Sequence, residues 1–169
     1  MALRGLGYRF DLAVGSVPYD TNAGASTGKR IRLRDARAVA FVLYKGAGSG
    51  TDDPVLTLKE ANASSGGTLQ NLAAITKYYK KEATTLAGTE TWAKTTQAAA
   101  ATLTLTGSAQ KQGIYVVEVS ADALSDGFAY VELDVADTGA AGAQLGAVMA
   151  ILSDLEVARD PANLAATLG

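Results

Sequence analysis

The chain contains no histidine and no cysteine among its 169 residues. Without histidine it lacks the commonest general base, and without cysteine it lacks a thiolate nucleophile and a favoured ligand of zinc and copper. A triad built on histidine is therefore excluded, and so is stabilisation by disulfide bonds. Stability has to come from core packing or from association with other subunits.

Long apolar runs are also missing. No stretch approaches the roughly 20 apolar residues that span a bilayer, and the start of the chain lacks the apolar segment of a signal peptide. We therefore expect a soluble protein that is not exported. Hydrophobic residues make up 48% of the chain and charged residues 19%, which is typical of a folded globular protein. The length suits a single domain over residues 1–169.

Charge is balanced overall but unevenly distributed along the chain. The net charge is −2, yet residues 1–45 hold eight Lys or Arg against three Asp or Glu. From Gln112 onward, Arg159 is the only cation and faces nine acids: Glu118, Asp122, Asp126, Glu132, Asp134, Asp137, Asp154, Glu156 and Asp160. Such asymmetry suits nucleic-acid binding or packing against subunits of opposite charge. The isoelectric point of about 5.1 favours packing, because nucleic-acid-binding domains are usually strongly basic.

Alternation of apolar and polar residues predicts an all-β fold. In the first expected strand, residues 8–17, the side chains of Tyr8, Phe10, Leu12 and Val14 share one face. Further strands are expected at 30–34, 38–44, 55–61, 74–82, 92–96, 101–106, 114–120 and 128–135. Strands at this spacing, separated by turn residues, are typical of a β-sandwich or a barrel.

Four segments depart from the simple strand pattern. Residues 18–28 are polar and poor in bulky side chains, so we expect an exposed loop or arm there. Residues 121–124 fit a single helical turn. Residues 145–155 fit both a helix and a strand, and a strand is the preferred interpretation. The tail, 156–169, contains Asp followed by Pro, which predicts a short terminal helix or an arm that docks on a neighbour.

The glycine-rich stretch 44–54 poses the question of phosphate binding. A P-loop requires Lys and Ser or Thr after its last glycine, whereas here Asp52 and Asp53 follow shortly after Gly50 and a strand comes next. A dinucleotide-binding fingerprint also fails, because the glycine spacing is wrong and no helix opens there. We interpret the stretch as a flexible connection between two strands. The sequence leaves open a calcium ion held by Asp52 and Asp53.

Three carboxylates could in principle form the acid pair of a glycosidase: Glu118, Glu132 and Asp134. Their positions fit ordinary β alternation, and they are interpreted as charges on solvent-facing strand surfaces. No catalytic, cofactor-binding or metal-binding residue is predicted, and the chain is not expected to be an enzyme.

Cationic and aromatic residues form the candidate contact surface, for other subunits or for a larger assembly. The candidates are Arg30, Arg32, Arg34, Arg37, Tyr78, Tyr79 and Trp92. The same residue types could pair with phosphates and stack on bases. Arginine and aromatic residues are enriched at protein interfaces, so contact with protein is preferred over nucleic acid.

Several segments of the chain, taken in order, resemble small virion proteins of tailed bacteriophages that are encoded near the major capsid protein. These segments are 38–48, 52–61, 78–81, 95–100 and 143–148, and the resemblance extends over about residues 8–155. It implies a β-sandwich or jelly-roll-like subunit without a cofactor that binds the outer capsid surface as a decoration, or cement, protein.

The resemblance also implies partners and a location. The expected partners are the major capsid protein and further copies of the chain, with a homotrimer favoured and attachment through residues 18–37. The protein would be made in the host cytoplasm and reside on the capsid; neither a membrane nor nucleic acid is expected as a partner. Two alternatives remain: a tail-tube or head–tail connector subunit, and a carbohydrate-binding module or adhesin that stacks sugars on Trp92, Tyr78 and Tyr79.

Overall fold

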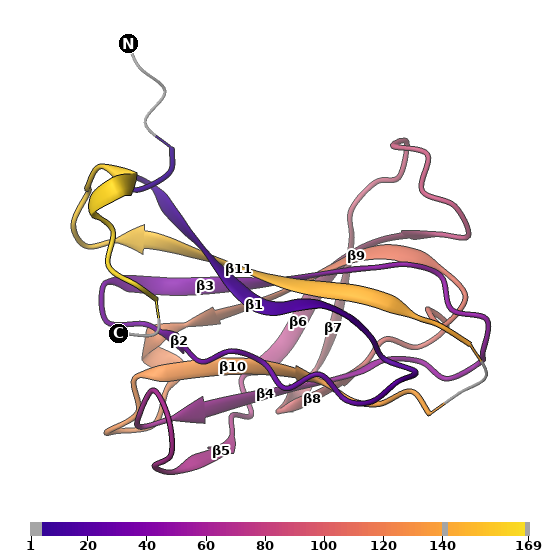
Figure 1. Cartoon of the computed structure of the whole chain (residues 1–169), viewed down its shortest axis with the longest axis horizontal. Coiled ribbons are helices and arrows are strands. Elements are labelled where there is room, and N and C mark those ends of the chain that lie inside the picture. Colours follow the sequence, from indigo (N-terminus) through magenta and orange to yellow (C-terminus); the bar gives the residue numbers. More distant parts are fainter. Residues whose placement is uncertain (1–4, 140–141, 168–169) are drawn as a thin grey trace.

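The computed structural model describes residues 5–139 and 142–167, which form two antiparallel β-sheets packed against each other (Figure 1). The six-stranded sheet has the order β1 (Phe10–Asp20), β11 (Leu145–Leu155), β3 (Ala36–Lys45), β9 (Gln112–Ser120), β6 (Ile75–Ala83) and β7 (Ala93–Ala100). The five-stranded sheet contains β2 (Ile31–Arg32), β10 (Tyr130–Val135), β4 (Val55–Ala61) and β5 (Leu69–Asn71), and β8 (Thr102–Thr104) also pairs with β4. The all-β sandwich expected from the sequence is confirmed.

One hydrophobic core fills the space between the two sheets. Alternate side chains of β3 and β9, such as Phe41 and Val117, point inward and meet Leu58 of β4 and Leu133 of β10. This is the period-two burial that a two-layer β-protein requires. Burial of these large apolar side chains supplies the main stabilising free energy, because no disulfide is available.

The short elements agree with expectation in two of the uncertain segments. Residues 145–155 form strand β11, so the strand interpretation is confirmed. The expected helical turn is present as the 3₁₀ helix η1 (Ala121–Ala123), which bridges the end of β9 and the loop before β10. A second 3₁₀ turn, η2 (Pro161–Asn163), follows Asp160, whose carboxylate accepts a hydrogen bond from the amide of Ala162. No helix in the described residues is long and apolar enough to cross a membrane.

The prediction of an exposed loop or arm at 18–28 is only partly right: Ala23, Ala25 and Thr27 are exposed and lie in no named strand, but the segment is not a free arm. Strand β1 continues to Asp20, and Thr21 is buried, with its hydroxyl bonded to the main chain of Gln144. Ser26 forms a β-bridge with Val135, and the amide of Gly28 donates to Asp134. The segment therefore lies along β10. These partners are more than 100 residues away in sequence, which local composition cannot reveal.

Strand β2 is shorter than the expected strand 30–34, because only Ile31 and Arg32 pair with β10. The C-terminal tail returns to it: the amide of Arg32 donates to the carbonyl of Thr167. The tail thus packs on its own subunit up to the last described residue, and residues 168–169 lie outside the described part.

Candidate interaction surface

The six-stranded sheet has an apolar outer face over three adjacent strands. Its inward side chains belong to the core. Its outward positions in the middle of β11 and β3 are uncharged, and exposed charges occur only near one end of these strands, at Asp154 and Arg37. They are Leu145, Ala147, Met149 and Ile151 on β11, and Ala38, Ala40, Val42 and Tyr44 on β3. Strand β1 adds Leu12, Val14 and Val17. We call this set the apolar face.

Strand register places these side chains in rows across the sheet. Val14 lies opposite Met149, and Met149 lies opposite Val42. The row continues through Val116 of β9 to Tyr79 of β6. Cross-strand neighbours on one face are close enough to touch, so the row forms a continuous apolar surface rather than scattered residues.

Much of this surface is in water. Leu12, Val14, Val17, Tyr44, Leu145 and Met149 are between 45% and 61% exposed. Single exposed apolar residues are common on monomers, but a contiguous group of this kind marks an interaction site. At one end the surface is hollowed: Pro18, Tyr19, Tyr44, Leu145 and Ala147 line an open depression of about 500 Å³.

Beyond β9, the same face of the sheet changes character. Lys77 pairs with Glu118 across the strand boundary at 3.5 Å, and its ammonium also lies 5.7 Å from the centre of the Tyr79 ring. Lys81 lies over Trp92 at 5.0 Å. We call Lys77, Tyr79, Lys81, Trp92 and Lys94 the aromatic–lysine border. It separates the apolar face from the free edge of β7.

The outer face of the five-stranded sheet is built differently, because it is charged and internally paired. Lys59 bonds Asp134, and Arg30 bonds Glu132 at 3.4 Å and the carbonyls of Ala63 and Gly66 at 2.8 and 2.7 Å. The segment that ends at Gly28 covers part of this surface. The two outer faces of the sandwich therefore differ: one carries charges that are mostly paired within the subunit, and the other exposes apolar side chains.

The structure divides the predicted arginines into two groups. Arg30 lies on the outer face of the five-stranded sheet and is held there by the contacts above, so it belongs to the subunit's own framework. Arg32 is partly buried beside the C-terminal tail, with its Nε atom buried and unbonded within the described residues. Arg34 and Arg37 are exposed, and Arg37 lies 3.8 Å from Glu156 at the surface.

The predicted aromatic contacts are divided in the same way. Tyr78 is only 6% exposed and belongs to the core, whereas Tyr79 is half-buried and Trp92 is 51% exposed. A register shift between Ile75 and Lys77 breaks the simple alternation of β6. As a result Ile75 and Tyr78 both point inward, which strict period-two reasoning could not anticipate. Tyr78 is therefore not on the surface of the subunit.

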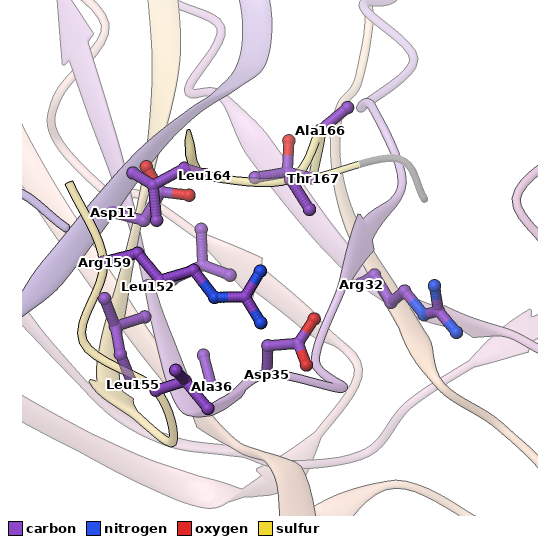
Figure 2. Close-up of a pocket in the computed structure, with 12 residues that line it drawn as sticks. Asp11, Arg32, Asp35, Ala36, Leu152, Leu155, Arg159, Leu164, Ala166 and Thr167 are labelled. Carbon is purple, nitrogen blue, oxygen red and sulfur yellow. The ribbon is translucent and has the colours of Figure 1, made fainter. Parts of the chain in front are cut away.

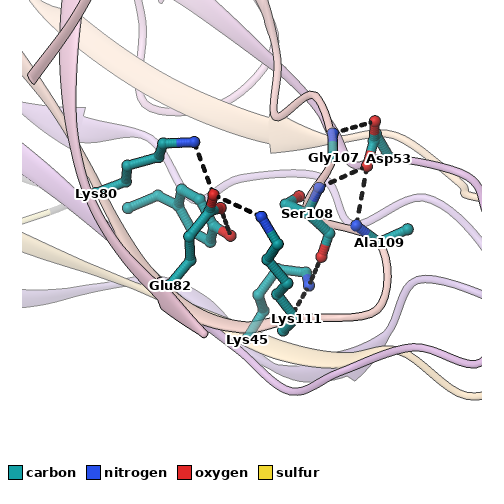
Figure 3. A network of polar contacts seen from close by, with 9 residues as sticks. Lys45, Asp53, Lys80, Glu82, Gly107, Ser108, Ala109 and Lys111 are labelled. Atoms are coloured by element: carbon teal, nitrogen blue, oxygen red, sulfur yellow. Dashed lines mark hydrogen bonds and ion pairs between the residues drawn. The ribbon is translucent and has the colours of Figure 1, made fainter. Parts of the chain in front are cut away.

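The glycine-rich stretch 44–54 holds a polar network at its two ends (Figure 3). The Asp53 carboxylate accepts hydrogen bonds from the amides of Gly107, Ser108 and Ala109 at 2.7 to 2.9 Å. Lys45, only 3% exposed, donates to the carbonyls of Ser108 and Lys111. Both Asp53 oxygens are thus engaged. In the glycine-rich stretch itself, the amides of Gly46 and Gly48 donate to the carbonyls of Leu145 and Ala109 and are not free to meet a phosphate.

Lys45 and Glu82 illustrate opposite effects of burial. Burial lowers the pKa of Lys45 to about 8, against the opposing influence of Glu82 and Asp53. Burial alone would raise the pKa of Glu82, but hydrogen bonds from Lys80, Lys111 and the Tyr115 hydroxyl outweigh it and lower that pKa. The network stabilises the turn at 107–111 and offers no opening to a ligand.

The three carboxylates considered for a glycosidase do not converge. Glu118 lies on the six-stranded sheet in its pair with Lys77, whereas Glu132 and Asp134 lie on the other sheet. Burial and the neighbouring Asp134 raise the pKa of Glu132. The described residues contain no group of three or more side chains suited to a metal ion.

A small cavity of about 210 Å³ lies beneath the C-terminal tail (Figure 2). Leu152, Leu155 and Ala36 form its apolar floor, and the tail residue Leu164 closes one side. The Arg159 side chain extends toward Asp35, while the Arg32 guanidinium points away. The cavity is a packing space between the tail and the sheet.

No known protein family, curated protein or solved structure matches the chain. The apolar face is therefore the feature of the subunit that bears on function, and the residues predicted from the sequence as contacts do not belong to it. The sequence does contain a sign of this face. In 38–44 and 145–152 the residues are apolar or small at both odd and even positions, as in strands that are buried on both faces.

Proposed function

We propose that the protein is a structural virion component that binds the outer surface of a tailed-phage capsid and reinforces the shell. The resemblance in sequence motivates the virion role. The surface of the subunit supports a role in assembly, because an apolar sheet face is exposed.

The observation that carries the proposal is the continuous apolar row from Val14 through Met149 to Val42. A monomer gains nothing by presenting such a row to water, whereas an assembly subunit buries it against a neighbour. Binding of many copies to a closed shell would then lower the free energy of the assembled state by mass action and multivalency.

The contact with the capsid is proposed at the end of the sandwich that carries Arg34 and Arg37. Both side chains are exposed, and they flank Asp35 in the turn between β2 and β3. The other candidates are partly or wholly enclosed in the subunit, namely Arg30, Arg32 and Tyr78. The proposed contact is therefore made by Arg34 and Arg37. Exposed cations of this kind steer association with an acidic surface and make binding salt-dependent.

The test is binding to capsid shells assembled without this protein. Purified wild-type protein should co-sediment with the shells, and imaging should place it on their outer surface. Arg34→Glu should reduce the affinity at least tenfold at physiological salt, because it reverses a contact charge. Lys94→Glu is the matched control: it reverses an exposed charge on β7 and should leave shell binding unchanged.

One observation favours the tail-tube alternative. Strand β7 lies at the edge of the six-stranded sheet, and its sequence is mostly small and uncharged, which would permit strand-to-strand joining between subunits. Polymerisation into rings or tubes, with no binding to shells, would replace the capsid proposal with this one. Glycan binding that is lost in Trp92→Ala would instead support the adhesin alternative.

A further inference from the structure

We propose that a second copy of this chain covers the apolar face, through a two-fold, face-to-face pairing of two six-stranded sheets centred on Met149. The inference rests on the same apolar face as the proposed function and names the neighbour that covers it, whereas attachment to the capsid is proposed at Arg34 and Arg37.

The first argument is the residue pattern of the strands. Ala38 to Tyr44 and Leu145 to Leu152 are apolar or small at inward and outward positions alike. Strands with this composition are normally buried on both faces. By contrast, β10 alternates core residues with the carboxylates Glu132 and Asp134. Within the six-stranded sheet, therefore, β3 and β11 have the composition of strands that are covered on both faces.

The orientation of β1 gives a second argument. Leu12 and Val14 share one face, as the sequence predicts, but that face points away from the core. The inward positions are taken by the small residues Ala13, Gly15 and Ser16, because Val148 lies close against Gly15. The larger side chains of β1 are thus placed outward, beside Met149.

The area is of the size that a subunit contact needs. The six most exposed side chains together leave on the order of 600 Å² in water, at the upper limit of patches on ordinary monomers. Two such faces pressed together would bury about 1,200 Å², the lower limit of a specific interface. The half-exposed Val42 and Ile151 between them add to this area.

The shape and charge of the face fit an identical copy. Sheets that pack face to face need matching twist, which a second copy has by construction. The side chains of the apolar face are uncharged, and the nearest charges lie at its ends, with Asp20 beside the hollow and Arg37 and Asp154 near the opposite end of β3 and β11. With a two-fold axis along β11, β1 of one copy lies over β3 of the other, so that Tyr44 faces Val17 and the hollow beside Pro18. The aromatic–lysine border extends past the contact and stays in water.

The two-fold geometry makes a sharp prediction about Met149. It lies in the middle of β11, which is the central strand of the apolar face. In an isologous contact a residue on the axis meets its own counterpart. Met149 of one copy should therefore touch Met149 of the other.

The first experiment measures mass in solution by sedimentation equilibrium. Wild-type protein at micromolar concentration should give the mass of two chains of 17.3 kDa, which is 34.6 kDa. Met149→Lys should give a folded monomer, with the dissociation constant raised at least 100-fold. Leu69→Lys is the matched control, because Leu69 is an exposed leucine on the other sheet and its replacement should leave the dimer intact.

The second experiment uses the absence of cysteine from the chain. Met149→Cys introduces a single thiol, and mild oxidation should produce a covalent dimer in high yield. Leu69→Cys should remain uncrosslinked under the same conditions. Because cysteine is small and apolar, this variant also tests the contact without introducing a charge that could unfold the sheet.

Three results would overturn the inference. One is a wild-type monomer at a hundred micromolar. Another is an oligomer whose mass is unchanged by Met149→Lys. The third is a complex of three chains without crosslinking of Met149→Cys, which would restore the trimer implied by the resemblance. If wild-type protein is monomeric and Met149→Lys abolishes shell binding, the occupant is the capsid and not a second copy.

Discussion

At the scale of single residues, the buried ionisable groups fall into two kinds. Glu60 and Asp53 have their oxygens bonded by nearby donors, so their burial fixes turns in place. Glu132 and Lys45 carry charge in surroundings that favour the neutral form. The difference is not visible in the sequence, where Glu60 and Glu132 both lie in ordinary strand segments. It predicts opposite responses to substitution and to pH.

Glu60→Gln should lower the free energy of unfolding by about 2–3 kcal/mol. The Glu60 carboxylate accepts hydrogen bonds from the amide and hydroxyl of Ser125 and from Gln70, and these bonds lower its pKa although burial alone would raise it. In the variant, the side-chain NH₂ group of glutamine would replace one accepting oxygen and face a group that also donates, so at least one hydrogen bond would be lost. Urea unfolding at pH 7 measures the change.

Glu132→Gln should be neutral or stabilising by up to about 1 kcal/mol in the same assay. The Oε1 atom of Glu132 is buried without a partner in the described residues, and burial beside Asp134 raises the carboxyl pKa. The Glu132 carboxyl therefore has a higher pKa in the folded state than in the unfolded state, and between the two pKa values the folded state binds more protons. The wild type should lose stability relative to the variant as the pH rises through that window. A loss above 2 kcal/mol at pH 7 would contradict this view of the site.

Lys45 gives the pH dependence of opposite sign. Its folded pKa is about 8 and its unfolded pKa about 10.5, so the unfolded chain binds more protons between these values and stability rises with pH there. From pH 7.5 to 9.5 the wild type should gain about 2 kcal/mol relative to Lys45→Met. Burial also raises the pKa of Tyr115, an effect of opposite direction that both proteins share above pH 10. Parallel curves for the two proteins would show that the ammonium is not desolvated.

At the scale of elements, the segment between β1 and β2 depends on Gly28. A Cβ atom there would lie 2.5 Å from the carbonyl oxygen and 2.8 Å from the amide nitrogen of Leu133. Gly28→Ala should push the segment off β10, destabilise the protein by about 2–3 kcal/mol and expose residues 21–28 to protease.

Gly46→Ala serves as the control for that experiment. The nearest atom to a Cβ at Gly46 is the Leu145 carbonyl oxygen at 3.6 Å, an ordinary contact. Its unfolding free energy should stay within about 0.5 kcal/mol of wild type. Equal effects of the two substitutions would mean that backbone freedom, and not close packing on β10, requires glycine at position 28.

The β6–β7 connection is the element that projects furthest from the sandwich, at the upper right of Figure 1. Glu90 holds its tip by accepting hydrogen bonds from the amides of Ala87 and Gly88. Trp92 at its base is exposed, but Lys81 lies over the ring. The loop is thus held in a defined conformation beside the aromatic–lysine border, and the Trp92 face that Lys81 covers is not open for stacking on a sugar.

At the scale of the whole molecule, the apolar face should couple stability to concentration. Folded chains that associate are stabilised by mass action, so a hundredfold increase in protein concentration should raise Tm by about 3–6 °C. Met149→Lys should remove this dependence, and Leu69→Lys should retain it. Differential scanning calorimetry at two concentrations makes the comparison; an unchanged wild-type Tm would show that the exposed face does not associate.

The sequence alone determined the fold class and the position of nearly every strand, because period-two alternation is a local property of the backbone. It also determined which chemistries are unavailable, since a chain without histidine or cysteine cannot supply their side chains. The proposed capsid role likewise began with a resemblance in sequence and stays a proposal.

Only the tertiary structure decided which way each face points and which charges are free. The apolar side of β1 turned outward because Gly15 fits against Val148. Arg30 is held against its own subunit because folding brings the carbonyls of Ala63 and Gly66 close to it. Alternation assigns side chains to two faces without saying which one meets the core. That choice depends on contacts between residues far apart in the chain, and here it left the apolar face exposed.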